Sequence, residues 1–251
     1  MVDNSLFSKE APMSMLKHIL SAFAIVERIL RARTAYFTEI GQNQDLPDKI
    51  LHLLILIALG FSVFGGVAAL SGRALGPALW GIVKLPALFL ISGLICLPTL
   101  YYFSVLFGSR LRFLQMITLI LTSQAVAAVL ALGVTPISLL FLLSGTDAAF
   151  LVLLNIGALA LCAVLGLIFL VQGTLYANES EPPERMTFGG WIKLFAHGGV
   201  RSLVLLGWLL LYGLIGAQLS YALRPFFGVP LEGHDFFSSI GHAVLRLFGA
   251  R

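Results

Sequence analysis

A short stretch near the C-terminus contains the residue types of a hydrolytic site. His234, Asp235, Ser238, Ser239 and His242 lie close together in the sequence. In a catalytic triad, a histidine takes the proton of a serine hydroxyl while a carboxylate orients the histidine. The stretch lacks the GxSxG turn that presents a nucleophilic serine, and two histidines without a neighbouring cysteine are a poor zinc pattern. The chain also has no phosphate-binding loop and no dinucleotide fingerprint. We therefore expect no enzymatic activity, no cofactor and no metal.

Three amide side chains, those of Gln124, Asn155 and Gln218, lie within long apolar segments. In one interpretation they hydrogen-bond across helices or between subunits, each contributing about 0.6–2 kcal/mol. In the alternative, they line the pore of an oligomer that conducts ions or small solutes. Amides form no charged selectivity ring, and the apolar segments contain no Asp, Glu, Lys or Arg that would serve a proton relay. We favour helix packing and keep the pore as the alternative.

Small residues are spaced to allow close helix packing in two of the apolar segments. Gly213 and Ala217 form a small-xxx-small pair in the last segment. In the segment before it, the small side chains at Gly157, Cys162 and Gly166 make one part of the helix narrower. Small side chains let the backbones of two helices approach closely. This pattern predicts contact with another helix without saying whether that helix belongs to the same chain.

The composition indicates whether water or lipid surrounds these segments. The chain has 251 residues, of which 59% are apolar and 11% are charged, whereas soluble domains carry about 25% charged residues. So few charges cannot cover a water-facing surface, which excludes a soluble enzyme domain, and the apolar content excludes a disordered chain. The net charge of +4 indicates no nucleic-acid partner, because the basic residues flank apolar segments as membrane anchors do. The sequence predicts a polytopic membrane protein.

A membrane-spanning helix needs about 20 mostly apolar residues. Five segments meet this requirement: 50–70, 86–107, 113–132, 148–171 and 202–223. The third segment continues into further apolar residues, where Pro136 should end a helix because proline lacks the backbone donor and clashes with the preceding turn. We expect residues 134–145 to form an extracellular connection containing an interfacial half-helix, with a re-entrant loop as the alternative.

The residues before the first span follow a different pattern. Apolar side chains recur with a helical period from Leu16 to Phe37, while Lys17, Arg28 and Arg31 occupy much of the remaining surface. Such a helix is expected to lie on the anionic cytoplasmic leaflet, and packing on the loops of the protein itself is the alternative. Residues 236–248 predict a second, shorter amphipathic helix.

The distribution of basic residues predicts the topology. Most of them lie in the N-terminal tail and in loops on the same side of the bilayer, including Arg110 and Arg112 between the second and third spans. The positive-inside rule then places the N-terminus in the cytoplasm and the C-terminus outside. Residues 1–49 form a cytoplasmic tail, 50–223 the spanning domain and 224–251 an extracytoplasmic tail. We expect Lys17, Arg28, Arg31, Arg110 and Arg112 at the membrane surface.

Short motifs in the middle of the chain carry a resemblance to a known family. They are VKLP at residues 83–86, LPTLYY at 97–102 and the hairpin FGSRLRF at 107–113. Residues 83–172 resemble the Yip1-type membrane domain, a family with bacterial members. The resemblance implies five spans with a cytoplasmic N-terminus, in agreement with the charge distribution. It also implies a non-catalytic scaffold or trafficking-type protein. The motifs that eukaryotic members use for small-GTPase partners are not evident, so that partner class is not carried over.

Together these observations predict an all-α protein, a polytopic membrane helix bundle of five transmembrane helices with an interfacial amphipathic helix at each end. We expect it in the bacterial cytoplasmic membrane, in contact with lipid and with copies of itself or other membrane subunits. Its expected function is that of a scaffold or regulatory subunit that acts through helix contacts. An oligomeric channel lined by Gln124, Asn155 or Gln218 is the alternative.

Overall fold

The computed structural model describes residues 21, 25–29, 31–70, 75–106, 111–178 and 199–223. Every regular element in these ranges is helical. Residues 25–29, called the N-terminal segment below, are helical as well. The other helices are α2 (Arg33–Gly41), α3 (Leu46–Ala69), α4 (Leu75–Leu106), α5 (Phe113–Leu143), α6 (Ala148–Asn178) and α8 (Gly199–Leu223).

Four of these helices are long and apolar enough to cross a membrane. The qualifying ranges are Leu46–Ala69 of α3, Leu79–Leu106 of α4, Phe113–Leu143 of α5 and Ala148–Thr174 of α6. The range Gly207–Ser220 of α8 is apolar but shorter than these four. The predicted all-helical membrane class is therefore supported by four helices, and the fifth span stays a prediction.

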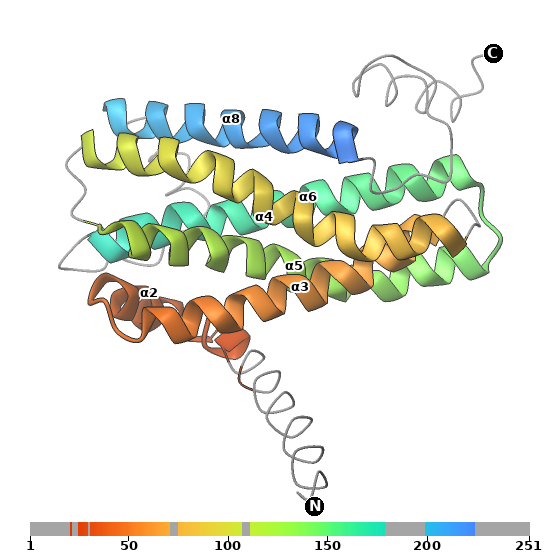
Figure 1. Cartoon of the computed structure of the whole chain (residues 1–251), viewed down its shortest axis with the longest axis horizontal. Coiled ribbons are helices and arrows are strands. Elements are labelled where there is room, and N and C mark those ends of the chain that lie inside the picture. The colour runs from red at the N-terminus through yellow and green to blue at the C-terminus, as the bar shows by residue number, and fades with distance from the viewer. Residues whose placement is uncertain are drawn as a thin grey trace, which may run out of the picture.

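The long helices run side by side in one bundle, as Figure 1 shows. Helix α5 packs between α3 and α6, α4 packs against α3, and α8 packs against α4, away from α2. The side chains of Met116 and Ala131 on α5 are completely enclosed. By contrast, Leu94 on α4 is 69% exposed and Leu210 on α8 is 67% exposed. Large apolar side chains facing outward fit a bundle whose flanks are surrounded by lipid.

Helix α5 runs without a break through Pro136, so the connection predicted at residues 134–145 is wrong. The same continuous helix excludes a double crossing of this stretch. Thr135 Oγ1 donates to a carbonyl oxygen one turn earlier at 3.0 Å, and Phe141 packs edge-to-face on Phe150 of α6 at 5.6 Å between ring centroids. A proline is tolerated in a spanning helix when hydroxyl side chains and a neighbouring helix support the region that it disturbs.

Helix α4 begins at Leu75, well before the start of the predicted span 86–107. Pro86 lies inside the helix, and its missing N–H leaves the carbonyl oxygen of Ile82 without the usual helical donor. Ser62 Oγ on α3 donates to that oxygen at 2.9 Å. A side chain of the neighbouring helix thus replaces the lost backbone hydrogen bond, and the helix extends toward its N-terminus.

The described part of the predicted N-terminal amphipathic helix packs on the bundle and does not lie apart from it. Ile29 of the N-terminal segment and Phe37 of α2 are each 1% exposed. The Phe37 ring fills a notch on α6 where Gly173 has no side chain. Their described partners belong to α3, α5 and α6. The position of this helix on the cytoplasmic leaflet stays a prediction. The predicted helix at 236–248 and Lys17 lie outside the described residues.

Candidate functional site

A charged cluster of Arg28, Glu39 and Lys49 joins the N-terminal segment, α2 and α3. Arg28 Nη2 donates to Glu39 Oε1 at 2.5 Å, and Lys49 Nζ donates to Glu39 Oε2 at 2.9 Å. Exposure of the side chain falls from 56% for Arg28 to 24% for Glu39 and 9% for Lys49. The hydrogen bond from Lys49 is the main reason why the pKa of Glu39 is below its ordinary value, and it outweighs the opposing effect of burial. The carboxylate therefore stays ionised at neutral pH and balances both cations.

Tyr36 extends this cluster into the bundle. Its ring centroid lies 5.5 Å from Lys49 Nζ, within the range of a cation–π interaction. Its hydroxyl is 3.3 Å from Thr122 Oγ1 on α5. Burial raises the pKa of Tyr36 to about 12, so the phenol remains neutral at physiological pH. The buried cation is thus enclosed by one carboxylate and one aromatic ring.

Gln115 connects the end of α2 to the start of α5. Its Nε2 donates to the carbonyl oxygens of Ile40 at 2.9 Å and Gly41 at 2.8 Å. Its Oε1 accepts a hydrogen bond from the backbone N–H of Arg112 at 2.7 Å. The last carbonyls of a helix and the first N–H groups of the next have no intrahelical partners. One side chain supplies partners to both ends and fixes α2 against the bundle.

A second polar cluster, the amide cluster of Gln124, Trp208 and Tyr212, lies within the long helices. Gln124 Nε2 on α5 donates to the carbonyl oxygen of Phe89 on α4 at 2.7 Å and to the Tyr212 hydroxyl on α8 at 3.3 Å. Trp208 Nε1 donates to the carbonyl oxygen of Cys96 on α4 at 3.2 Å. These neutral hydrogen bonds hold α8 against α4 and α5.

The position of the Gln124 amide depends on Gly93. A Cβ atom at Gly93 would overlap with Gln124 Nε2, so glycine provides the space in which the amide lies. The amide nitrogen must face Phe89, because an oxygen in its place would meet another carbonyl oxygen. Within the described residues, Gln124 Oε1 is buried and has no hydrogen-bond partner.

The structure places the three predicted amides in different surroundings. Asn155 Oδ1 on α6 accepts a hydrogen bond from Ser138 Oγ on α5 at 2.5 Å, and both residues are 2% exposed. Gln124 lies in the amide cluster, whereas Gln218 is exposed on α8. The three side chains therefore do not meet in one chain. Tyr212, Trp208 and Ser138 were not singled out from the sequence, and no spacing marks them as hydrogen-bond partners.

The predicted small-residue positions also differ from one another. A Cβ atom at Gly213 would meet no atom within 4 Å, and the same is true at Gly157. Ala217 is half-buried. Gly166 lies directly against the backbone of Ser123 on α5. Of these positions, Gly166 thus serves packing within the chain, while Gly213 faces outward.

The tightest contact between α3 and α4 involves glycines that the sequence analysis did not single out. A Cβ atom at Gly65 would collide with the carbonyl oxygen of Gly81, and one at Gly81 with that of Gly65. Gly60 similarly lies against the backbone of Ala128 on α5. The glycines at positions 60, 65 and 66 of the first span were the available signal, but the facing residues follow from the fold.

The predicted membrane-surface residues have the following positions. Arg31 pairs with Glu27 at 3.4 Å, and both are well exposed. Arg112 is exposed at the beginning of α5, whereas Lys17 and Arg110 lie outside the described residues, as does the C-terminal group of histidines and serines. In the part of the chain that the structure describes, no three His, Cys, Asp or Glu side chains come together as a metal site.

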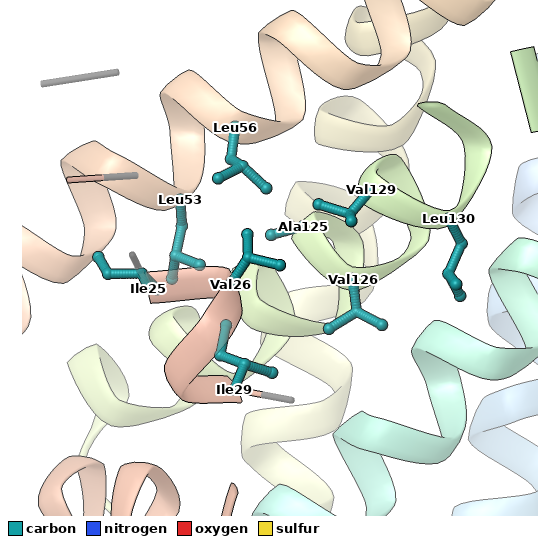
Figure 2. Close-up of a pocket in the computed structure, with 9 residues that line it drawn as sticks. All are labelled: Ile25, Val26, Ile29, Leu53, Leu56, Ala125, Val126, Val129 and Leu130. Atoms are coloured by element: carbon teal, nitrogen blue, oxygen red, sulfur yellow. The ribbon is translucent and has the colours of Figure 1, made fainter. Parts of the chain in front are cut away.

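A small apolar pocket lies beside the charged cluster, between the N-terminal segment, α3 and α5. Its volume is about 30 Å³. Figure 2 shows hydrocarbon side chains converging on it from the three elements. The lining residues are Ile25, Val26, Ile29, Leu53, Leu56, Ala125, Val126, Val129 and Leu130. Among the described residues, no polar atom contributes to its surface.

The fold and its clusters define a class of protein: an all-helical chain with four helices able to cross a membrane, in which buried amides and hydroxyls bond between helices. No protein-family profile, curated protein or solved structure matches the chain. The Yip1-type resemblance therefore stays a prediction.

Proposed function

We propose that this chain is a non-catalytic integral membrane protein that acts as a scaffold or regulatory subunit through contacts between helices. In this proposal α8 is a fifth span, the N-terminus is cytoplasmic and the C-terminus is extracytoplasmic, in a bacterial cytoplasmic membrane. The resemblance to Yip1-type domains agrees with this arrangement. The protein assembles as a homo-oligomer or as a subunit of a larger membrane complex.

The observation that supports this function is the way in which the bundle uses its hydrophilic groups. Gln124 bonds a carbonyl oxygen of α4, Ser62 bonds another, and Ser138 bonds Asn155 across α5 and α6. In an apolar environment such hydrogen bonds stabilise helix association by about 0.6–2 kcal/mol each. These side chains are engaged in holding helices together, which suits a protein whose activity is assembly.

The outward face of α8 is the surface that we assign to assembly. Gly207, Leu210, Gly213, Leu214 and Gln218 are exposed on it. The glycines leave room for the backbone of another helix, and an amide that faces lipid gains a hydrogen bond when it meets a polar partner. A second helix on this face would bury the small residues and the amide together.

Native mass spectrometry of the full-length protein in mild detergent tests this function. We expect a defined oligomer or a stoichiometric complex with other membrane subunits. Gly213→Leu should reduce that species several-fold, because the larger side chain prevents close approach on α8. Gly157→Leu is the matched control, since Gly157 also has no neighbouring atom but lies on α6. A wild-type protein that is monomeric and without partners would contradict the proposal.

The exposure of Gln218 also supports the second candidate, an oligomeric channel. Gln124 and Asn155 are engaged within the chain, so a pore between subunits would be lined by Gln218. Purified protein in liposomes would then conduct, and Gln218→Leu would change the conductance. Silent liposomes combined with a stable oligomer would favour the scaffold.

A further inference from the structure

We propose that the apolar pocket between the N-terminal segment, α3 and α5 binds the end of a hydrocarbon chain of a membrane lipid. The inference rests on the membrane location of α3 and α5, which is part of the proposed function, and adds a binding site that assembly does not require. The site would recognise hydrocarbon in general, without selecting a headgroup.

The lining of the pocket determines the chemistry of its occupant. Ile25 and Ile29 contribute side chains from the N-terminal segment, Leu53 and Leu56 from α3, and Val129 from α5 (Figure 2). With no polar atom on its surface, the pocket offers water none of the two to four hydrogen bonds that a buried water needs. Apolar cavities of this kind stay dry and accept apolar molecules.

The size of the pocket limits how much of a ligand enters. Its volume of about 30 Å³ is roughly twice to three times the ~10–15 Å³ that one water-sized group requires. A few carbon atoms fit, and a whole acyl chain does not. Because α3 and α5 are long apolar helices, the medium beside them in a bilayer is lipid hydrocarbon at high concentration. The end of an acyl chain is therefore the apolar group with the readiest access.

One wall of the pocket comes from a shorter stretch of helix than the others. Leu53, Leu56 and Val129 belong to long helices, whereas Ile25 and Ile29 belong to the N-terminal segment. The described polar links that leave this segment are the pair of Glu27 with Arg31, the backbone hydrogen bond from Ala32 N–H to the Arg28 carbonyl oxygen and the ion pair of Arg28 with Glu39. Of these, the ion pair of Arg28 with Glu39 reaches α2, and Arg28 is 56% exposed. Exposed ion pairs contribute little stability. A small displacement of this wall would enlarge the pocket and admit more of the chain.

Photo-crosslinking in nanodiscs tests the site. The full-length protein is reconstituted with a phospholipid that carries a diazirine at the end of one acyl chain, and labelled peptides are identified by mass spectrometry. We expect labelling of the peptide that contains Val129. Val129→Phe fills the pocket and should lower this labelling at least fivefold, whereas Leu56→Ala enlarges the pocket and should raise it about twofold.

Matched variants separate the pocket from the general lipid-facing surface. Val164 on α6 is 54% exposed and lies outside the pocket lining, so Val164→Phe should leave the labelling of the Val129 peptide unchanged. Equal labelling in wild type, Val129→Phe and Leu56→Ala, each with wild-type helix content, would overturn the proposal. The opposite signs expected for filling and enlargement keep the test decisive if one variant does not fold.

Two further variants test the role of the wall that the N-terminal segment forms. Arg28→Gln removes the ion pair to α2, whereas Arg31→Gln removes a pair with Glu27 within the same stretch of chain. Labelling should rise with Arg28→Gln and not with Arg31→Gln, and an equal response would overturn the role of the wall. Absence of the wild-type protein from the membrane fraction would instead refute the proposed function. A membrane-bound oligomer without pocket labelling would refute the lipid site alone.

Discussion

The charged cluster and the amide cluster both connect elements that are distant in the sequence, but they use different chemical groups. Glu39 lies between Arg28 and Lys49 near the start of α3 and remains partly exposed. Gln124 lies far from either end of α5 and bonds to neutral groups of α4 and α8. Both clusters link three separate parts of the chain, but ionised groups make one set of links and neutral groups the other.

The difference follows from access to water. An ionised group is costly to bury unless it is paired, whereas an amide needs only hydrogen-bond partners. The charged cluster lies where α2 and α3 meet and Arg28 can remain hydrated, and its single carboxylate serves two cations. In the amide cluster the acceptors are the Tyr212 hydroxyl and the carbonyl oxygens of Phe89 and Cys96, which are all neutral. Loss of a partner should therefore be more damaging in the charged cluster.

The largest effect is expected for Glu39→Gln. This substitution leaves the almost buried cation of Lys49 without a countercharge. Removing one partner of a fully buried ion pair costs about 3–5 kcal/mol, and the partial exposure of Glu39 reduces the expected loss to about 2–3 kcal/mol. The free energy of unfolding in detergent, followed by circular dichroism, measures the effect.

Two comparisons sharpen this prediction. Glu39→Gln combined with Lys49→Met removes the stranded charge as well and should recover at least about 1 kcal/mol. Because the pKa of Glu39 is lowered in the folded protein, its contribution is present above the ordinary carboxyl pKa and is lost as the pH falls through the folded value. The Glu39→Gln protein should lack this part of the acid sensitivity. An unchanged acid transition would contradict the role given to Glu39.

A smaller effect is expected for Gly93→Ala in the amide cluster. The new methyl group would take the space of Gln124 Nε2 and displace the amide from its acceptors. Losing these neutral hydrogen bonds should cost about 1–2 kcal/mol. Gly157→Ala, at a helical position with open space, should be neutral or stabilising by up to about 1 kcal/mol. Equal unfolding midpoints for the two variants would show that the Gln124 amide does not need the space beside Gly93.

The smallest effect is expected for Tyr212→Phe. The hydroxyl receives a long hydrogen bond of 3.3 Å from Gln124, and the amide keeps its bond to Phe89 when the hydroxyl is removed. The loss should be about 0.6 kcal/mol, the average for hydrogen bonds between membrane helices. A cost equal to that of Glu39→Gln would remove the distinction between the two clusters. Melting of both variants side by side in one detergent makes the comparison direct.

The helical membrane class was predictable because it depends on composition and on the length of apolar runs. The beginnings of α5 at Phe113 and α6 at Ala148 were also predicted, since Arg112 and Asp147 mark the ends of the apolar runs. Local rules failed at Pro86 and Pro136. Both prolines interrupt an isolated helix, and in each case contacts with the neighbouring helix support the continuation.

Residues of the candidate sites were predicted less completely. Gln124 and Asn155 stood out because amides are rare in apolar runs. Glu39 and Lys49 did not, since charged residues next to a span are normally read as surface anchors and their spacing carries no signal. Gly213 showed a packing pattern, but the structure leaves it exposed while Gly65 and Gly81 make the close contact. A small residue permits close approach without specifying which helix approaches.

The sequence by itself indicated that lipid surrounds the long segments and that these segments are helices. Both follow from local properties, namely the free energy of transferring a residue to lipid and the length of an apolar run. The tertiary structure decided which hydrophilic groups meet. Three features depend on groups from different elements. They are the pairing of Glu39 with Lys49, the position of the Gln124 amide beside Gly93 and the continuation of α5 through Pro136. Such partners are set by how the helices pack in three dimensions, and a linear pattern carries no record of that arrangement.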